Sequence, residues 1–366
     1  MIAIKRFGIL TSGGDAPGLN AAIRAVCRTA ESRFGMQAVG IKNGYRGLIE
    51  GNCTILSGSD ISGILTRGGT ILGTSREKPF KNPLPDEKTG LLPVEKIKKT
   101  YEEQKLDALV CIGGNGTATT ASLLFEEGLN VVGLPKTIDN DIVGTDITFG
   151  FHTALDVATE AIDRIHTTAH SHSRIMVIEV MGHKAGWLAL YSGLAGGADA
   201  VLIPEIPYDI DSVASCVKKR RDAGKQFSIV VVAEGALSVD EALLPKKELK
   251  KRRKLMPSSI AYRVAHELEE ETGLESRVTV LGYLQRGGTP SAFDRVLATR
   301  FGAAGAHFLS EGRFGSLVAM KNGEIESVKL SEIAGKVKHI PTAKNGSEKE
   351  HSMIKAGRGL GICFGD

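Results

Sequence analysis

Short apolar runs alternate along most of this chain with longer segments in which apolar residues recur at helical spacing. Each apolar run predicts a buried strand, and these runs cover residues 7–10, 39–41, 106–112, 129–134, 173–180, 200–203, 228–232 and 277–281. The segments with helical spacing cover residues 20–32, 94–104, 118–127, 153–168, 191–195, 212–224, 258–271 and 294–309. Such alternation throughout predicts an α/β fold with parallel sheets that helices cover on both faces.

The length of 366 residues allows one large domain or two medium ones. We predict two Rossmann-like α/β domains with largely parallel sheets and the active site in the interdomain cleft. The predicted larger domain comprises residues 1–150 and about 285–335, and the smaller one comprises residues 151–284 and about 336–366. The tail from about Ile340, which contains the polar sequence Asn345-Gly-Ser-Glu-Lys-Glu-His, is predicted to be partly mobile.

Composition is that of an ordinary soluble globular protein, with 42% hydrophobic and 24% charged residues and a net charge of +4. The dense basic run Lys246–Lys254 is more typical of a solvated helix face or loop than of a nucleic-acid site. The five cysteines contain no CxxC pair, which argues against zinc and is typical of reduced thiols. The N-terminus is too charged for a signal peptide, and no apolar run approaches about 18 residues. We expect a cytoplasmic protein that binds neither nucleic acid nor membrane.

Glycine is the compositional outlier, with 44 residues that include several doublets at predicted strand ends. These doublets are Gly13-Gly14, Gly68-Gly69, Gly113-Gly114, Gly196-Gly197 and Gly287-Gly288. Glycine lets backbone N–H groups approach an anion closely, and a helix N-terminus adds a favourable dipole. The doublets that polar residues follow therefore predict a site that holds phosphate groups through the main chain. The segment Thr11–Asn20 has this arrangement but lacks the P-loop pattern.

The segment Pro135–Asp141, Pro-Lys-Thr-Ile-Asp-Asn-Asp, follows a predicted strand and carries the densest polar cluster of the chain. In open α/β sheets, ligands bind at the carboxyl ends of the strands. A hydroxyl group that must lose a proton needs a base, so one carboxylate suits that task while the other orients groups or contacts a metal. An Asx-rich turn without catalytic function is the alternative interpretation.

Six motifs together resemble those of the 6-phosphofructokinase family, from Phe7 to about Gly323. They are Gly13–Gly18, Gly68–Arg76, Gly113–Thr117, Pro135–Asp141, Glu179–Gly182 and Gly282–Gly288. A single GGxG loop is weak evidence, because lipid kinases and NAD kinases carry similar loops, but six motifs in order are specific. The resemblance implies phosphorylation of D-fructose 6-phosphate at its 1-hydroxyl to fructose 1,6-bisphosphate, the committed step of glycolysis, with Mg²⁺ as cofactor. It also implies that the larger domain binds the phosphoryl donor and the smaller one the sugar phosphate.

The resemblance further implies roles for individual residues. Asp139 corresponds to the base that takes the proton from the sugar hydroxyl, and the other implied catalytic residues are Thr137, Arg76 and Gly14. The implied contacts to fructose 6-phosphate are Thr137, Asp139, Asp141, Arg174, Met181, Gly182, His183, Glu234, Arg277, Tyr283 and Arg286. The implied contacts to ATP are Gly13, Gly14, Tyr45, Arg76, Gly113, Gly114, Asn115, Gly116, Thr117 and Lys136. Because the family supplies Arg174 and Arg277 from a neighbouring subunit, a homodimer or homotetramer with shared active sites is expected.

Several positions depart from the family's bacterial ATP-dependent members. Asn115 stands where a magnesium-linked carboxylate is usual, so Mg²⁺ is expected to rely on Asp139 or Asp141, phosphate oxygens and water, with Asn115 a weak ligand. Tyr283 replaces a sugar-site His, as in pyrophosphate-using and actinobacterial-type members, and His183 replaces an Arg. Of the cations at the family's effector site, three are retained (Arg24, Arg28, Lys225) and three are replaced (Gly58, His166, Ala223). Regulation by ADP or phosphoenolpyruvate at that site is therefore not expected.

Two positions bear on the phosphoryl donor. Gly116 has no side chain, so an α-phosphate can pass, whereas pyrophosphate-dependent relatives usually carry Asp there. Lys136 is typical of the pyrophosphate enzymes, but a flexible Lys can swing away, so we expect ATP and keep pyrophosphate as the alternative. An NAD-kinase-like enzyme is a remoter alternative, disfavoured by the retained Arg286 and Glu234. A catalytically silent sugar-phosphate sensor is disfavoured by the retained Asp139.

Overall fold

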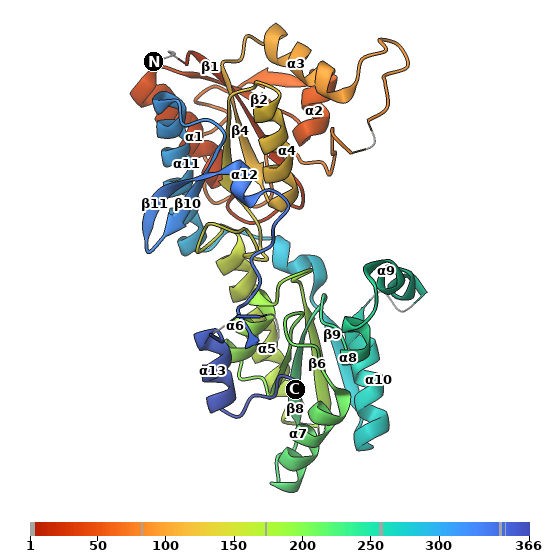
Figure 1. Ribbon diagram of the computed structural model, residues 1–366. Helices are drawn as coiled ribbons and strands as arrows, with labels where there is room; N and C mark the ends of the chain where they lie inside the picture. The colour runs from red at the N-terminus through yellow and green to blue at the C-terminus, as the bar shows by residue number, and fades with distance from the viewer. Residues whose placement is uncertain (1–3, 82, 173, 256–258, 344–345, 348) are drawn as a thin grey trace. The chain divides into compact units, whose positions relative to one another are not determined.

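The computed structural model describes residues 4–81, 83–172, 174–255, 259–343, 346–347 and 349–366, which form two compact units (Figure 1). Unit 1 comprises Met1–Ile138, Ile142–Thr153 and Arg286–Val337. Unit 2 comprises Asp139–Asp141, Ala154–Gln285 and Lys338–Asp366. Residues 139–141, which we predicted within the larger domain, are thus grouped with the other unit.

Unit 1 contains a seven-stranded sheet in the order β11-β10-β5-β4-β1-β2-β3. Its strands are β1 (Arg6–Ser12), β2 (Gln37–Ile41), β3 (Cys53–Ile55), β4 (Ala108–Gly113), β5 (Val131–Pro135), β10 (Ser316–Lys321) and β11 (Glu324–Lys329). The order β3-β2-β1-β4-β5 is that of a doubly wound sheet, in which the chain reverses direction across the sheet between β1 and β4. Its helices are α1 (Leu19–Phe34), α2 (Gly44–Glu50), α3 (Pro93–Glu103), α4 (Asn115–Glu126), α11 (Ala292–Glu311) and α12 (Leu330–Ile333).

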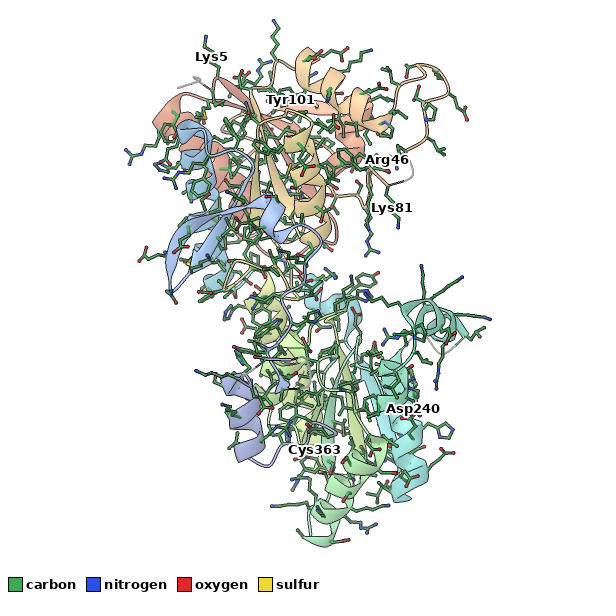
Figure 2. All side chains as sticks on the ribbon, in the orientation of Figure 1. Lys5, Arg46, Lys81, Tyr101, Asp240 and Cys363 are labelled. Carbon is green, nitrogen blue, oxygen red and sulfur yellow. The ribbon has the colours of Figure 1, made fainter. Side chains whose placement is uncertain are left out.

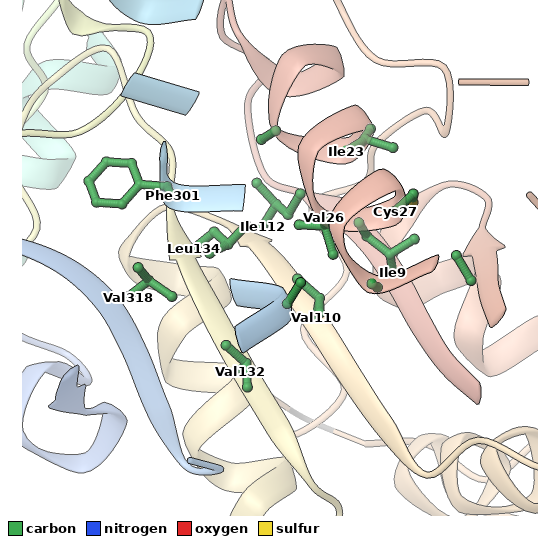
Figure 3. Packing of buried hydrophobic residues seen from close by; sticks show 14 of the residues in the cluster. Ile9, Ile23, Val26, Cys27, Val110, Ile112, Val132, Leu134, Phe301 and Val318 are labelled. Carbon is green, nitrogen blue, oxygen red and sulfur yellow. The ribbon is translucent and has the colours of Figure 1, made fainter. Parts of the chain in front are cut away.

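Helices cover both faces of this sheet because successive strand residues point to opposite sides. Ile9, Val110 and Val132 pack on one face with residues of α1 and α11 (Figure 3). The neighbouring residues Leu10 and Leu109 pack on the other face with residues of α2, α3 and α4. Burial on both faces explains why these strands appear in the sequence as continuous apolar runs.

Unit 2 contains a four-stranded parallel sheet in the order β7-β8-β6-β9. Its strands are β6 (Ile175–Val180), β7 (Ala200–Leu202), β8 (Ser228–Ala233) and β9 (Ser276–Val280). Residues of α7 (Ile210–Asp222) and α10 (Ile260–Thr272) pack with Val177 and Val230 in one core, and α6 (Trp187–Ala195) packs on β7 and β8. The remaining elements are α5 (Phe151–Ala169), α8 (Val239–Ala242), α9 (Lys246–Leu255), the 3₁₀ turn η1 (Gly282–Arg286) and α13 (Ser352–Gly359).

The predicted α/β fold with largely parallel sheets is confirmed, and antiparallel pairs lie at both edges of the larger sheet. There β3 pairs with β2, and β11 pairs with β10, in antiparallel fashion. The β10–β11 hairpin turns at Asn322-Gly323, where both residues have positive φ (51° and 84°). Asn-Gly is the preferred dipeptide of such two-residue turns, so the sequence did contain this signal.

Several local features differ from the predictions. The segment after β2, for which no element was predicted, forms α2, and α4 begins at Asn115 instead of Ala118. The predicted starts of β6 at Ser173 and α10 at Ser258 lie outside the described residues. The tail is not simply polar: α13 forms, and Ile340, Ile354 and Phe364 are buried, although Asn345 and Glu348 lie outside the described residues.

The basic run predicted as a solvated face or loop lies in the helix α9 (Figure 2). Lys246, Lys247, Lys250 and Lys251 are exposed, whereas Arg253 donates to the carbonyls of Gly235 (3.3 Å) and Ala236 (3.0 Å). In the described part of the chain, no helix is long and apolar enough to span a membrane.

Candidate active site

Three loops with predicted site residues lie at the carboxyl ends of neighbouring strands in unit 1. Ser12 at the end of β1 lies opposite Gly113 at the end of β4, and Gly113 lies opposite Pro135 at the end of β5. The loops that follow these strands are therefore neighbours. They flank the point where strand order reverses, which is the usual ligand position in doubly wound sheets.

The loop after β1 exposes its backbone because Gly13 has a left-handed conformation, with φ of 85°. Its N–H donates to the Ser75 carbonyl (2.9 Å), and its carbonyl accepts from Thr74 Oγ1 (2.6 Å). These two bonds fix the segment that leads into the exposed Arg76 beside the β1 loop. The loop after β1 and the segment that carries Arg76, both predicted to bind the phosphoryl donor, are thus in contact within unit 1.

Two buried polar atoms near this loop have no hydrogen-bond partner among the described residues: Ser75 Oγ and Arg286 Nε. Arg286 donates through Nη1 to the Asp15 carbonyl (2.9 Å), and a Cβ added at Gly14 would lie 2.8 Å from the same nitrogen. Native proteins rarely leave buried polar atoms unsatisfied, so a water molecule or a polar ligand is expected at these atoms. Arg286, predicted as a sugar-phosphate contact, lies in unit 1 beside the donor loop.

The loop after β4 passes directly into α4, whose N-cap Gly114 provides no capping side chain. A Cβ at Gly113 would lie 2.2 Å from Thr117 Oγ1, so only glycine fits there, and that hydroxyl donates to the Ser12 carbonyl (3.2 Å). In contrast, outside its chain neighbours and the backbone of α4, no described atom lies within 4 Å of a Cβ built on Gly116. The first turn of α4 thus presents uncapped N–H groups, an arrangement that favours anions, beside open space at Gly116.

Tyr45 does not face this space. Its side chain is 1% exposed, and its hydroxyl donates to the Thr117 carbonyl (3.0 Å). Burial, together with the neighbouring Cys111, raises the pKa of Tyr45 well above its ordinary value. In the structure Tyr45 packs against α4 because the unpredicted helix α2 turns it inward, and its contact with the nucleotide stays a prediction.

Lys136 is held more firmly than a flexible surface lysine. It is 3% exposed, and its ammonium donates to the carbonyls of Ser12 (3.3 Å) and Gly14. Its backbone N–H donates to the Gly113 carbonyl (3.0 Å). Lys136 was expected to be able to swing away; in this structure its ammonium is held against the loop after β1, and its effect on the choice of donor stays a prediction.

The segment after Lys136 contains a left-handed turn at Asn140, with φ of 50°. Thr137, whose carbonyl accepts from Thr148 Oγ1 (2.8 Å), belongs to unit 1, whereas Asp139 and Asp141 belong to unit 2. Asparagine tolerates this conformation better than most residues. Asp139 and Asp141, both partly buried, are the residues directly before and after Asn140 in this turn.

Several residues of unit 2 that are predicted to contact the sugar phosphate lie together at the carboxyl ends of the parallel strands. Val180 at the end of β6 lies opposite Ala233 at the end of β8, and the N–H of Glu234 donates to the Val180 carbonyl (2.9 Å). Met181, Gly182 and His183 follow β6 at this edge, and Tyr283, 75% exposed, follows β9. The sheet therefore places these predicted contacts together.

Gln285, which sequence reasoning missed, joins two of these loops. Its side chain is fully buried, its Oε1 accepts from the Met181 N–H (3.2 Å), and its Nε2 donates to the Gly282 carbonyl (3.2 Å). A buried amide that satisfies two separate loops fixes their relative position. The motif Gln285-Arg286-Gly287-Gly288 drew attention to Arg286 but gave no sign of this role.

Arg174 and Arg277 lie at the opposite end of the same sheet. Arg174 precedes β6, and Arg277 pairs in register with Met176 near its beginning. Both arginines pair with Glu275, through Arg174 Nε to Oε2 (2.5 Å) and Arg277 Nη2 to Oε1. The hydrogen bond from Arg174 is the main cause that lowers the pKa of Glu275. Glu275, also missed from the sequence, thus holds the two cations together.

The residues proposed for Mg²⁺ fit a site completed by substrate phosphates and water better than a site made by protein ligands alone. Within the described residues, no group of three or more His, Cys, Asp and Glu side chains could hold a metal ion. Mg²⁺ is commonly bound by one or two carboxylates, substrate phosphates and water. The carboxylates of Asp139 and Asp141 fit such a donor set, and the Asn115 amide at the start of α4 is a weaker oxygen donor.

A family model described as phosphofructokinase matches residues 6–309. The chain belongs to the phosphofructokinase family. This result confirms the resemblance drawn from the six motifs.

Individual relatives are similar over most of the chain. It is 60% identical to a protein of Spirochaeta thermophila named ATP-dependent 6-phosphofructokinase, over 100% of this chain and 98% of that protein. It is 48% identical to a protein of Amycolatopsis mediterranei named pyrophosphate–fructose 6-phosphate 1-phosphotransferase, over 93% of this chain and 97% of that protein. The crystal structure of Pichia pastoris phosphofructokinase in the T-state has a TM-score of 0.79 and 36% identity, over 91% of this chain and 36% of that chain.

Proposed function

We propose that this protein transfers the γ-phosphoryl group of ATP to the 1-hydroxyl of D-fructose 6-phosphate, giving fructose 1,6-bisphosphate. The observation that carries the proposal is the position of Asp139 in a chain that is 60% identical, over its whole length, to an ATP-dependent 6-phosphofructokinase. Asp139 follows Thr137 by two residues, so their Cα atoms lie within about 7 Å of each other. Chain connectivity alone therefore keeps the candidate base close to the loops at the end of β5.

The proposed step divides between acceptor and donor residues. Asp139 takes the proton from the 1-hydroxyl, whose oxygen then attacks the γ-phosphorus as the bond to ADP breaks. Negative charge on the transferred group is met by the exposed Arg76, by the fixed ammonium of Lys136 and by the uncapped N–H groups of α4. Bound Mg²⁺ supplies further charge neutralisation at the phosphate oxygens.

ATP is favoured as donor by the open space at Gly116. Outside the chain neighbours and the backbone of α4, no described atom lies within 4 Å of a Cβ placed there, so the first turn of α4 leaves room for an α-phosphate. Relatives at 60% and 48% identity differ in the donor that their names state, so overall similarity alone does not decide the donor. Lys136 remains the feature shared with pyrophosphate enzymes, and its buried position suits either donor.

We further propose that active sites are shared between subunits of a homodimer or homotetramer. Arg174 and Arg277 lie one full strand length, roughly 20 Å, from the Met181 and Glu234 end of the sheet. They are therefore poorly placed to serve the same sugar phosphate within one chain. The edge strand β9 and the turn η1 that follows it leave Val280, Tyr283 and Leu284 exposed (42%, 75% and 69%), and a second copy of the chain would cover such a surface.

The test is a coupled assay with fructose 6-phosphate, Mg²⁺ and either ATP or pyrophosphate. We expect turnover with ATP and a kcat/KM for pyrophosphate at least about tenfold lower, equal to about 1.4 kcal/mol. Activity with pyrophosphate alone would reverse the donor assignment. Binding of fructose 6-phosphate without turnover by either donor would favour a sensor, and phosphorylation of another acceptor instead would overturn the proposal.

A further inference from the structure

Lys338 lies in the segment that leads from α12 to α13, and it contacts the turn that carries the two carboxylates. Its backbone N–H donates to the Asp141 carbonyl (2.8 Å), and its ammonium donates to Asn140 Oδ1 (3.2 Å). All three residues belong to unit 2. The family model ends at residue 309, so these contacts come from a part of the chain that the match does not include.

Lys338 is itself fixed by Trp187. The indole Nε1 donates to the Lys338 carbonyl (2.8 Å), and the ammonium lies 5.3 Å from the centroid of the indole ring. A cation over an aromatic face is attracted by the ring quadrupole. Trp187 is 7% exposed, and the His351 ring packs edge-on against it at 5.1 Å. Backbone N–H, carbonyl and ammonium of Lys338 are thus all engaged, which limits its freedom to move.

The turn needs such support because Asn140 is 6% exposed and left-handed, a conformation that costs energy for any residue except glycine. A small rotation at Asn140 would redirect the side chains of both neighbours, Asp139 and Asp141. Catalytic groups lose effect when they are displaced by about 1 Å. The hydrogen bond from Lys338 to Asn140 therefore affects the orientation of the Asp139 carboxylate.

We propose that Lys338 is a positioning residue for Asp139: it holds the Asn140 turn so that the carboxylate meets the sugar 1-hydroxyl. The inference rests on the proposed role of Asp139 as base. It also assigns a function to the C-terminal segment, which supports the catalytic turn by a charged hydrogen bond and is itself anchored on Trp187.

The first experiment compares Lys338→Met, which keeps side-chain length but removes the ammonium, with Lys338→Arg and the wild type. Lys338→Met should lower kcat about ten- to a hundredfold and change the KM for fructose 6-phosphate less than about threefold. Lys338→Arg, which retains a donor, should recover most of kcat. Lys336→Met, at an exposed position two residues earlier, is the matched control and should resemble the wild type.

A spectroscopic measurement accompanies the kinetics, because Trp187 is the single tryptophan of the chain. Fructose 6-phosphate should change its emission in the wild type and in Lys336→Met, and change it much less in Lys338→Met. Unchanged kcat together with an unchanged emission response in a folded Lys338→Met protein would overturn the inference.

A second variant keeps the test decisive if Lys338→Met fails to fold. Asn140→Gly preserves access to the left-handed conformation but removes the Oδ1 acceptor. It should lower kcat by about the same factor as Lys338→Met, and the two changes together should cost little more than either alone. If Asn140→Gly keeps wild-type kcat while Asp139→Asn is inactive, the positioning role is wrong and the proposed function stands. An active Asp139→Asn protein would instead overturn the role of the base.

Discussion

Arg174 and Glu234 lie at opposite ends of one parallel sheet, although both are predicted to contact the same sugar phosphate. Arg174 immediately precedes β6, whereas Glu234 follows β8, whose last residue pairs with the last residue of β6. One molecule of fructose 6-phosphate cannot span the roughly 20 Å between these ends. Two chains must therefore contribute if both predictions are right.

Subunit mixing tests this arrangement. Arg277→Ala and Asp139→Asn should each be nearly inactive, but mixed and allowed to exchange they should regain up to about a quarter of wild-type activity. Hybrid dimers then contain one site with both intact residues, because each variant damages a different half of the shared site. Exchange is verified with differently tagged subunits. Demonstrated exchange without recovered turnover would show that each site is built within one chain.

Substitution of the base is the most direct test of chemistry. Asp139→Asn keeps the shape of the side chain but cannot accept a proton, so kcat should fall at least about a hundredfold. The Kd for fructose 6-phosphate, measured by calorimetry, should change less than about threefold, because the amide still hydrogen-bonds. Asp146→Asn, on an exposed residue of the neighbouring loop, serves as control and should leave kcat unchanged. Near-normal turnover of Asp139→Asn would assign proton transfer to another group.

Gly116→Asp tests the discrimination between donors. The new side chain has room in the absence of ligand, and an Asp in the first turn of α4 favours the helix, so folding should be preserved. Its negative charge should repel an α-phosphate and lower kcat/KM for ATP at least about a hundredfold, or about 2.7 kcal/mol. Pyrophosphate use should fall less. The ratio of kcat/KM for the two donors is measured in both proteins, and an unchanged ratio would exclude Gly116 as the discriminating position.

His339 provides a pH-dependent contribution to stability next to the catalytic turn. The hydrogen bond to Glu205 is the main cause that raises the pKa of His339 above its ordinary value of 6.5. Because the folded protein holds this proton more tightly, the stabilisation is complete below about pH 6.5 and is lost as pH rises through the folded pKa.

The expected effect is small, because half of the His339 side chain is exposed. Between about pH 6 and 8, the Tm of the wild type should fall by about 1–2 °C more than that of His339→Gln. Thermal unfolding across that range measures the difference. His266→Gln, at a side chain that is 72% exposed, is the control and should follow the wild type. Parallel curves for His339→Gln and wild type would show that this proton does not stabilise the fold.

Sequence patterns predicted those site features that depend on strand ends, because apolar runs and glycine doublets mark them locally. Gly13 and Gly113 lie where parallel strands of unit 1 finish, and Glu234 lies where a strand of unit 2 finishes; within each unit, register brings the neighbouring loops together. The sequence could not show which side chains face away from a ligand. Tyr45 was predicted to contact the nucleotide, yet its side chain is buried, and the helix that turns it inward has no clear apolar periodicity.

Residues that support the site through distant partners were also beyond sequence reasoning. Gln285 contacts Met181 across 104 positions, and Lys338 contacts Asn140 across 198. Nothing in the local pattern around either residue differs from that of an ordinary turn. Only the folded chain shows that a glutamine and a lysine at these positions hold the loops that carry the chemistry.

The division of the chain has a practical consequence for dissecting the protein. Each unit is made from three separate stretches of sequence, so the backbone passes between the units five times. No single cut can release an intact unit, and a fragment ending at residue 309 would lack β10 and β11 as well as Lys338. A protease that nicks one exposed loop should therefore leave two pieces that remain associated, separating only when a denaturant is added.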